Sequence, residues 1–495
     1  MKIKKTWLIL LILLAIGAFL RFYNYENRIS LGWESARDYF VSDVGWGEKQ
    51  LPLTGPWASI APLTIGPWYW YFLILSRFFI PSLYAPWIAL GLASLSIVLI
   101  MYRIGVLLID KRLGLILAFL AALSPNLLHN SLFLTNPSLI VFLSSLCILV
   151  FLEIFIKNRG WLWGVLLGWL VGFTLLTHYQ GGGLLTLVLL LLFLRKKKVV
   201  IFLSSLLGLF IAALPMLIFE LNNHWFNTRG VLDFVLYRQY QLWTSMRWLK
   251  FIFELFPDTW VGLTGGPPWF GLVLMFGSGL ILFLRLIRKK LPFPLFLLGI
   301  SFLIQVIVVR YWRGERYLGW IQFFSPYLFI FTGLMIYDLL IQRVKKQHFY
   351  LAFGLIFFLW AGLISNSLKA RVEEEDVNTK KIREEIGQLG EIVGEEKFSF
   401  YYCGDSDGNE YNRNSYLLML FLEKAHADDG YKIGLANDYC QLPFIDKKKE
   451  ELHLIGALLD FSQASEAGIL KNNWKQETAQ PVYDRYAKWW YEEKP

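Results

Sequence analysis

The run Gly66-Pro-Trp-Tyr-Trp-Tyr-Phe-Leu-Ile-Leu-Ser-Arg-Phe-Phe-Ile80 decides the topology of this chain, because it is almost apolar enough to be a membrane span. If it crossed a bilayer, the basic loop Arg103–Arg112 and every later basic loop would lie outside, against the positive-inside rule. Its Trp and Tyr residues are typical of the headgroup level, where amphipathic rings prefer to lie. We therefore predict an interfacial helix here and count the spans without it.

Around this run the sequence holds apolar stretches of the length that a membrane crossing requires, about 17–25 residues. They fall near residues 6–23, 85–102, 113–129, 137–156, 161–178, 182–194, 199–219, 268–287, 292–309, 321–342 and 348–368. Hydrophobic residues make up 56% of the 495 residues and charged residues 17%, against roughly 45–50% and about 25% in soluble domains. Residues 1–368 are thus predicted to form a mainly α-helical, polytopic transmembrane bundle of about eleven spans, the first an uncleaved signal-anchor.

The net charge of +10 comes from short basic clusters between the apolar runs, not from one basic stripe, so no nucleic acid partner is expected. With the N-terminus in the cytoplasm, these clusters all fall in cytoplasmic loops of a cell-membrane protein. The other connections then face outward and are rich in His, Trp, Tyr, Asn and Gly-Pro. They include two long loops, residues 24–84 and 220–267, and the tail from residue 369.

The chain becomes polar beyond Ser367, and residues 369–495 are predicted to form a small extracytoplasmic α/β domain. Helices are expected over residues 376–394 and 414–425, and strands over 397–402 and 431–435. Cys403 and Cys440 lie in this region, and both a disulfide between them and two free thiols stay open. Cys147 lies in an apolar run and is expected to be buried.

The first outer loop carries the clearest candidate for chemistry, Gly32-Trp-Glu-Ser-Ala-Arg-Asp-Tyr39. Its Glu34, Arg37 and Asp38 place two acids and a guanidinium next to a membrane interface, where charges are costly and tend to be functional. A local ion pair that only orders the loop is the alternative interpretation.

This order of motifs resembles the polyprenyl-phosphate-sugar-dependent glycosyltransferases of the GT-C fold, which include protein O-mannosyltransferases and lipid A aminoarabinose transferases. The resemblance rests on the acid-x-x-Arg motif after the first span, the Gly-Pro-aromatic run and a helix that ends in a basic turn. It continues in Ser124–Ser131, Thr177–Gln180, Pro215–His224 and Arg316-Tyr317.

The resemblance implies an inverting transfer of a sugar from a polyprenyl-phosphate donor to an acceptor hydroxyl on the extracytoplasmic face. It assigns Glu34 as the catalytic base and places Arg37 near the carrier phosphate. The family's acid is usually Asp, and this departure leaves the base open to Asp38 or Asp43. Some members carry a Lys before the Pro of the aromatic run, where this chain has Ile65-Gly66, so one phosphate ligand is missing.

Other candidates come from basic or polar residues on the outer side. A departing phosphate needs cations, and outward-facing arginines go against the positive-inside bias. The phosphate-binding candidates are Arg37, Arg229, Arg310, Arg313, Arg316 and Tyr317, with Arg316 preferred. The substrate cavity is predicted to include His178, Tyr179, Glu220 and Tyr69, with packing or helix capping as the alternative for His178 and Glu220.

No nucleotide-binding motif is present, which favours a lipid-linked donor that enters from the bilayer. The acceptor, a lipid, glycan or protein, stays open, as does a divalent metal; no metal ligand is predicted. Two alternatives remain: a transporter or flippase of lipid-linked saccharides, and a polysaccharide polymerase or ligase. The charges crowd at one face instead of lying inside the spans, which favours surface catalysis over transport.

Overall fold

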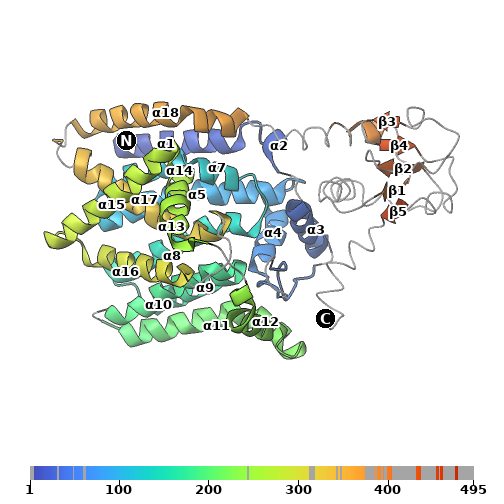
Figure 1. Cartoon of the computed structure of the whole chain (residues 1–495), viewed down its shortest axis with the longest axis horizontal. Coiled ribbons are helices and arrows are strands. Elements are labelled where there is room, and N and C mark those ends of the chain that lie inside the picture. The colour runs from blue at the N-terminus through green and yellow to red at the C-terminus, as the bar shows by residue number, and fades with distance from the viewer. Residues whose placement is uncertain are drawn as a thin grey trace. The chain divides into compact units, whose positions relative to one another are not determined.

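A computed structural model describes residues 5–373, apart from 31–32, 48, 59–62, 195, 242–244, 311–317, 342–343 and 346–347, and several short segments of 384–477 (Figure 1). The chain divides into two compact units. The first consists of residues 1–25, 53–72 and 80–374, and the second of residues 26–52, 73–79 and 375–495.

The first unit is a helical bundle. Its longer helices are α1 (Lys5–Phe22), α5 (Ala85–Leu108), α6 (Lys111–Ala122), α8 (Asn136–Lys157), α9 (Trp161–Thr177), α11 (Lys198–Asn222), α12 (Phe226–Leu236), α15 (Pro268–Ile287), α16 (Phe293–Arg310), α17 (Ser325–Ile336) and α18 (Phe349–Glu373). Its shorter helical segments are α7 (Pro125–Asn130), η1 (Tyr179–Leu184), α10 (Leu185–Leu190), η2 (Leu191–Phe193), η3 (Arg238–Gln241), α13 (Arg247–Lys250), η4 (Phe251–Leu255), α14 (Phe256–Thr264), η5 (Leu318–Phe324) and η6 (Tyr337–Ile341).

All eleven predicted apolar runs lie on helices of this bundle, and the prediction of a polytopic membrane protein is confirmed. Six of these helices are long and apolar enough to cross a membrane by themselves: α1, α5, α8, α11, α15 and α18. The other five runs form shorter or interrupted helices. The run 66–80 forms α4 (Trp68–Phe79), whose 12 residues reach about 18 Å at 1.5 Å per residue. That is short of the ~30 Å hydrocarbon core.

The span predicted over residues 113–129 is interrupted. Helix α6 ends at Ala122, and α7 starts at Pro125, which has no N–H to continue the α6 ladder. The Ser124 hydroxyl accepts the backbone N–H of Leu127 at 3.4 Å and so caps the new helix. The break turns the chain just before the predicted outer motif Ser124–Ser131.

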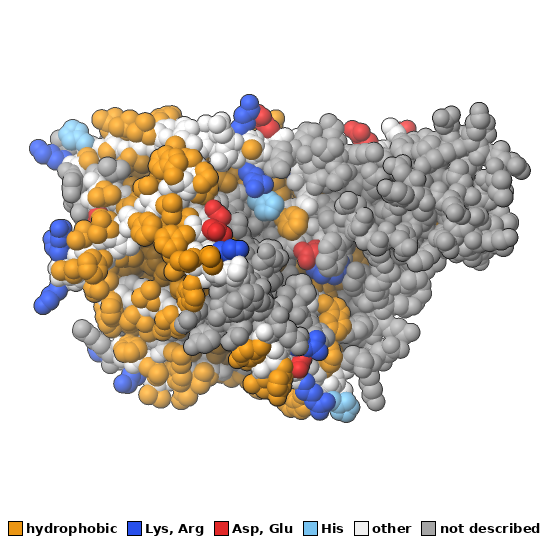
Figure 2. Space-filling model, in the orientation of Figure 1, with side chains coloured by type: hydrophobic (Ala, Val, Ile, Leu, Met, Phe, Trp, Pro, Cys, Tyr) orange, Lys and Arg blue, Asp and Glu red, His pale blue; other side chains and the backbone are white. Residues whose placement is uncertain are grey.

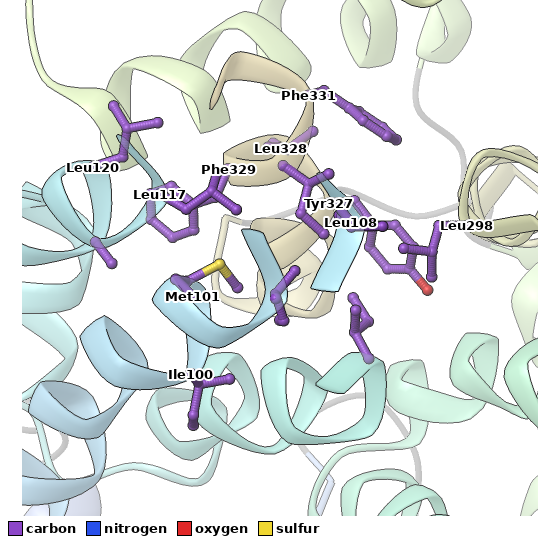
Figure 3. Close-up of a cluster of buried hydrophobic side chains, with 14 of the residues drawn as sticks. Ile100, Met101, Leu108, Leu117, Leu120, Leu298, Tyr327, Leu328, Phe329 and Phe331 are labelled. Carbon is purple, nitrogen blue, oxygen red and sulfur yellow. The ribbon is translucent and has the colours of Figure 1, made fainter. Parts of the chain in front are cut away.

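Helix α17 is the centre of the bundle, and every one of its residues is buried. A helix that is apolar on all sides belongs in an interior, and α17 packs against α6, α8 and α15. Figure 3 shows its side chains Tyr327, Leu328 and Phe329 beside Met101 of α5 and Leu117 of α6. In contrast, only 17–28% of the most apolar window is buried in α1, α11, α15 and α18, so these four helices lie on the lipid-facing side.

Helices α9 and α11 approach each other closely over a row of small residues. Gly164, Gly168 and Gly172 recur every four residues on α9 and so lie on one face. A Cβ on Gly168 would lie 1.8 Å from the carbonyl oxygen of Ser205, and a Cβ on Gly208 of α11 would lie 2.0 Å from the carbonyl oxygen of Val165. Only glycine fits at these positions, as in other small-x-x-x-small helix pairs of membrane proteins.

The C-terminal end of α1 is fixed by a buried arginine. Arg21 is 1% exposed, and its guanidinium donates to the Ser94 hydroxyl at 3.0 Å and to the carbonyls of Ala121 and Ala122 at 3.2 and 3.3 Å. These carbonyls belong to the last turn of α6, where the helix dipole favours a cation. Arg21 thus holds α1, α5 and α6 together at one point.

The opposite ends of the helices carry the basic loops and several ion pairs. Glu153 of α8 accepts from Arg103 at 2.9 Å and from Arg159 at 3.2 Å, and Asp338 pairs with Arg285 of α15. Figure 2 shows Lys and Arg side chains along the left edge of the molecule and apolar side chains over the adjoining surface. An apolar wall next to a basic edge is the arrangement expected of a membrane bundle.

The second unit contains α2 (Tyr25–Arg28) with its neighbour α3 (Trp33–Gly47), the C-terminal half of α4 and the C-terminal part of the chain. Its described strands are β1 (Phe398–Cys403), β2 (Tyr431–Leu435), β3 (His453–Ile455), β4 (Leu458–Asp460) and β5 (Trp474–Glu477). They form one sheet in the order β3-β4-β2-β1-β5, in which only the β1–β2 pair is parallel, with Phe398 opposite Tyr431.

The predicted strands 397–402 and 431–435 agree with β1 and β2 to within one residue. The predicted helix 414–425 lies outside the described residues, and so do most of the predicted helix 376–394 and Cys440. Cys147 is buried in the bundle as expected.

Candidate active site

The acidic motif of the first outer loop forms helix α3. Glu34, Arg37 and Asp38 stand at positions i, i+3 and i+4, so they share one face of the helix. The Arg37 Nε donates to Asp38 Oδ1 at 2.8 Å, and the side chains of Arg37 and Asp38 are 7% and 0% exposed. Asp38 is therefore held in a buried ion pair, which commits its carboxylate to Arg37.

The Glu34 carboxylate has a different environment. It is half-buried and makes no hydrogen bond or ion pair to any residue that the structure describes. Burial raises the pKa of Glu34, the nearby Arg37 lowers it in part, and the nearby Asp38 adds to the increase. A carboxylate with a raised pKa is a stronger base than an exposed glutamate, and proton transfer is most efficient when the pKa lies near the working pH.

The third candidate acid, Asp43, pairs with a residue of α4. The Arg77 Nη2 lies 3.2 Å from Asp43 Oδ1, and the guanidinium lies over the Tyr39 ring at 4.3 Å from its centroid. The α3–α4 contact is close, because a Cβ on Gly45 would come within 2.5 Å of Ile74. Of the three acids in this described helix, Glu34 alone lacks an ion pair.

In the first unit, two Gly-Pro turns fold the rest of the outer loop onto the bundle. The Gly55 N–H donates to the Ile65 carbonyl at 2.8 Å, and the Gly66 N–H donates to the Leu176 carbonyl of α9 at 2.7 Å. A Cβ on Gly55 would lie 2.2 Å from the Gly66 carbonyl oxygen, so this approach requires glycine. The Trp68 indole then donates to the Ala212 carbonyl of α11 at 2.6 Å.

A hydrogen-bond network joins this loop to the second outer loop. The Asn227 Oδ1 accepts the Thr64 N–H at 2.6 Å and the Thr64 hydroxyl at 3.1 Å. The Thr64 carbonyl accepts the Tyr179 hydroxyl at 2.6 Å. The Glu220 carboxylate accepts the backbone N–H groups of Asn227 and Thr228, both at 2.9 Å, at the start of α12. Tyr179 and Glu220 therefore fix the positions of two loops.

The remaining candidate side chains of the first unit, those of His178, Arg229 and Tyr69, differ in how deeply they are buried. The His178 side chain is half-buried and makes no hydrogen bond to a described residue. His178 follows the last residue of α9, Thr177, and precedes η1. Arg229 is exposed on α12 without an ion pair in the described part of the chain, and the Tyr69 side chain is fully buried.

Several predicted residues lie outside what the structure describes: Arg313, Arg316, Tyr317 and the side chain of Arg310. Their predicted contact with the donor phosphate stays a prediction. Among the described residues, no three His, Cys, Asp or Glu side chains gather as they would around a metal ion.

The structure adds three residues that the motif analysis did not single out: Arg77, Thr64 and Asn227. Arg77 had a signal, because it is the one charge within the apolar run Phe72–Ile80, and isolated charges near a membrane tend to have a specific partner. Thr64 and Asn227 had none, because a contact between residues 163 positions apart leaves no local pattern.

The helical bundle has the GT-C fold, the fold of polytopic membrane glycosyltransferases, as comparison with solved structures shows. One such structure is ArnT from Cupriavidus metallidurans in the apo state, with a TM-score of 0.56 and 11% identity over 86% of this chain and 92% of ArnT. The same protein bound to undecaprenyl phosphate matches with a TM-score of 0.53 and 12% identity, over 86% of this chain and 93% of ArnT.

A second similar structure is the oligosaccharyltransferase of Archaeoglobus fulgidus in the apo form, with a TM-score of 0.51 and 16% identity over 84% of this chain. This chain spans only 60% of the length of that enzyme. No protein-family model matches the sequence, and no curated protein matches it either.

Proposed function

We propose that this protein is an inverting glycosyltransferase that moves a sugar from a polyprenyl-phosphate donor to an acceptor hydroxyl on the extracytoplasmic face. The observation that carries the proposal is the contrast between two acids on one turn of α3. Asp38 is buried against Arg37, whereas Glu34 keeps a carboxylate without an ion pair among the described residues and has a raised pKa. This is the contrast expected of a structural acid and a general base.

In the proposed reaction, the acceptor oxygen attacks the anomeric carbon from the side opposite the phosphate. The new C–O bond forms as the bond from the sugar to the phosphate oxygen breaks, and Glu34 takes the proton of the acceptor hydroxyl. The polyprenyl phosphate leaves with the electron pair of the broken bond. Attack from the opposite side inverts the configuration at the anomeric carbon.

The departing phosphate needs positive charge around it. Arg37 lies one turn from Glu34 on the same helix face, and we assign it to the phosphate together with Arg229, Arg316 and Tyr317. His178 is assigned to a sugar hydroxyl. We assign Tyr179, Glu220 and the buried Tyr69 to the walls of the cavity, where they support the loops that enclose the substrate.

The fold supports a lipid-linked donor. Among the structures of the same fold, ArnT was solved with undecaprenyl phosphate and the archaeal oligosaccharyltransferase with a dolichol-phosphate and an inhibitory peptide. A donor of this kind reaches the enzyme from the bilayer, so the protein needs no domain for a soluble nucleotide sugar. We infer that residues 1–368 form the transferase domain and that residues 369–495, on the same outer side of the cell membrane, contribute to acceptor choice.

The test is turnover by the purified full-length protein with radiolabelled polyprenyl-phosphate sugars and membrane extracts as acceptors. Glu34→Gln is expected to lower the rate by about 10²-fold or more, which is the usual contribution of a general base. The matched control is Glu254→Gln, which changes an exposed acid of the second outer loop. NMR of the product should show the inverted anomer.

Full turnover by Glu34→Gln would rule out Glu34 as the base. If the wild-type protein transferred no sugar from any donor and instead moved lipid-linked saccharides across vesicle membranes, the flippase alternative would hold and the proposed transfer would be wrong.

A further inference from the structure

The basic end of the bundle contains a cavity of about 520 Å³ that the proposed transfer reaction does not use. Four helices form it: the first turn of α1, the end of α5, the start of α6 and the start of α18. Its lining includes Thr6, Lys111, Arg112, Leu115, Phe349 and Tyr350. It lies among the basic loops, at the end of the bundle that the positive-inside rule assigns to the cytoplasm.

The polar part of this cavity favours an anion. Lys111 is exposed and has no hydrogen bond or ion pair with a described residue, so its ammonium is free to bind a ligand. Arg112 is held in place, because its Nε donates to Asp110 at 3.0 Å and its Nη2 to the Tyr337 hydroxyl at 2.9 Å. Asp110 also lines the cavity, so the two cations Lys111 and Arg112 and the one carboxylate give the lining a net charge of +1.

Two hydroxyl groups complete the polar side of the cavity. The Thr6 and Tyr350 oxygens lie 3.0 Å apart and so join α1 to α18. Both groups line the cavity and can donate to a phosphate oxygen. The backbone N–H groups of Arg112 and Leu113 in the first α6 turn are not available, because the Asp110 carboxylate accepts both. Recognition of an anion therefore depends on side chains.

The rest of the lining is apolar. Leu115 and Phe349 are buried beside the cavity, and the Arg112 guanidinium lies 6.0 Å from the centroid of the Phe349 ring. Next in sequence to the lining residues Thr6 and Tyr350, the apolar side chains of Trp7 and Leu351 are 54% and 76% exposed. A free phosphate would leave these side chains uncovered, whereas a lipid would cover them with the start of its acyl chains. A basic pocket between transmembrane helices on this side is a typical place for an anionic headgroup.

We propose that this cavity binds the phosphate headgroup of an anionic phospholipid from the leaflet at the basic end of the bundle. Lys111 and Arg112 bind the phosphate oxygens, the Thr6 and Tyr350 hydroxyls add hydrogen bonds, and the acyl chains follow the exposed side chains of Trp7 and Leu351. Because α1, α6 and α18 all contact the same lipid, binding also stabilises the packing of the first and last membrane helices against the bundle. This proposal is independent of the sugar transfer.

The test is native mass spectrometry of the full-length protein in detergent, titrated with phosphatidylglycerol or with phosphatidylcholine of the same acyl chains. We expect the first phosphatidylglycerol to bind more tightly than phosphatidylcholine. Lys111→Glu should weaken this first binding step by at least about fivefold, since one basic side chain near a headgroup contributes about that factor. Lys111 is exposed, so this variant should keep the wild-type melting temperature.

The matched control is Lys290→Glu, the same change at an exposed lysine after α15 that does not line the cavity. Equal losses in Lys111→Glu and Lys290→Glu, or equal binding of the two lipids, would overturn the proposal. A separate arm adds inorganic phosphate. If millimolar phosphate displaced the first phosphatidylglycerol and bound in a Lys111-dependent way, the ligand would be free phosphate and not a lipid.

Discussion

Glu34 and Asp38 are separated by one helical turn, yet their carboxylates have different chemical properties. Asp38 is fully buried and accepts from Arg37 at 2.8 Å, whereas Glu34 stays half-buried and has a raised pKa. Two neighbouring acids can take different roles when burial and pairing differ, and this is the usual way in which a site separates a base from a structural acid.

The raised pKa of Glu34 predicts the pH dependence of the transfer. A base must be deprotonated, so kcat/KM should fall as the pH falls through the pKa of Glu34, and the midpoint of this loss should lie above the ordinary glutamate pKa of about 4.3. Arg37→Gln removes the charge that lowers this pKa, so its acid limb should shift to higher pH. The measurement is the pH profile of kcat/KM.

A profile in which Arg37→Gln lowers the rate equally at every pH would show that Arg37 acts only on the phosphate. The control is Arg229→Gln, which removes an arginine of α12 that is assigned to the phosphate and is not one of the two charged residues, Arg37 and Asp38, that shift the Glu34 pKa. Its acid limb should coincide with that of the wild type.

At the scale of single residues, the sequence identified three candidate acids but could not show which of them is the base. The acid-x-x-Arg motif directed attention to Glu34 and Arg37 and left Asp38 and Asp43 as alternatives. The separation depends on burial and on ion pairs, one of which joins Asp43 to Arg77, 34 residues further along the chain. Residue spacing contains no information about such contacts.

At the scale of the elements, the α9–α11 pair shows that two helices of the bundle pack with their backbones in close contact. Gly168 faces the backbone of Ser205, whereas Gly279 on α15 has no atom within 4 Å of the position of its Cβ. The two glycines therefore allow the same substitution to be compared in a packed and in an open site.

We predict that Gly168→Ala lowers the melting temperature and Gly279→Ala does not. Alanine normally stabilises a helix by about 1 kcal/mol relative to glycine, but at residue 168 its methyl group would overlap Ser205, and overpacking costs roughly 1–3 kcal/mol. The measurement is thermal unfolding in detergent. A melting temperature for Gly168→Ala at or above that of Gly279→Ala would contradict the close packing of α9 and α11.

The contact between the two outer loops gives a second prediction for the elements. Asn227→Ala leaves the buried N–H of Thr64 without its acceptor, which costs roughly 1–3 kcal/mol. Hydrogen exchange at residues 63–66 should become faster, and turnover should fall with it. The control is Asn222→Ala at the exposed end of α11, which should leave both unchanged. Unchanged exchange in Asn227→Ala would mean that the loops are held by other contacts.

The apolar runs were enough to predict the helices of the bundle, because hydropathy is a local property. They were not enough to predict the break between α6 and α7, although Ser124-Pro125 is a recognised start of a helix. The polar residues Ser124 and Asn126 lie between apolar residues on both sides, so the average hydropathy of the run 113–129 stays high and does not reveal the break. The network of Thr64, Asn227 and Tyr179 was also not predictable, since it depends on how three distant segments pack.

For the whole molecule, the alternation of basic and aromatic loops predicts that the two ends of the bundle lie on opposite sides of a membrane. The structure places ion pairs such as Arg285 with Asp338 at one end and the Gly55–Gly66 turns near the end of α9 at the other. The sidedness of these two ends remains a prediction from the positions of the basic residues.

This prediction can be tested with single cysteines in a variant whose Cys147, Cys403 and Cys440 are replaced by serine. An impermeant maleimide should label Arg229→Cys in intact cells, because α12 belongs to the predicted second outer loop, residues 220–267. It should label Arg288→Cys only after the cells are permeabilised. Labelling of Arg288→Cys in intact cells would reverse the topology and remove Glu34 from the outer face.

The Arg21 contacts also set an order for assembly during synthesis. The carbonyl groups that receive this guanidinium belong to Ala121 and Ala122, about one hundred residues later in the chain. When α1 first enters the membrane, α6 has not yet been synthesised. The Arg21 guanidinium therefore stays hydrated at the membrane–water interface until its partners are inserted. We therefore expect α1 to reach its final packed position only after α6, the third predicted span, has been inserted.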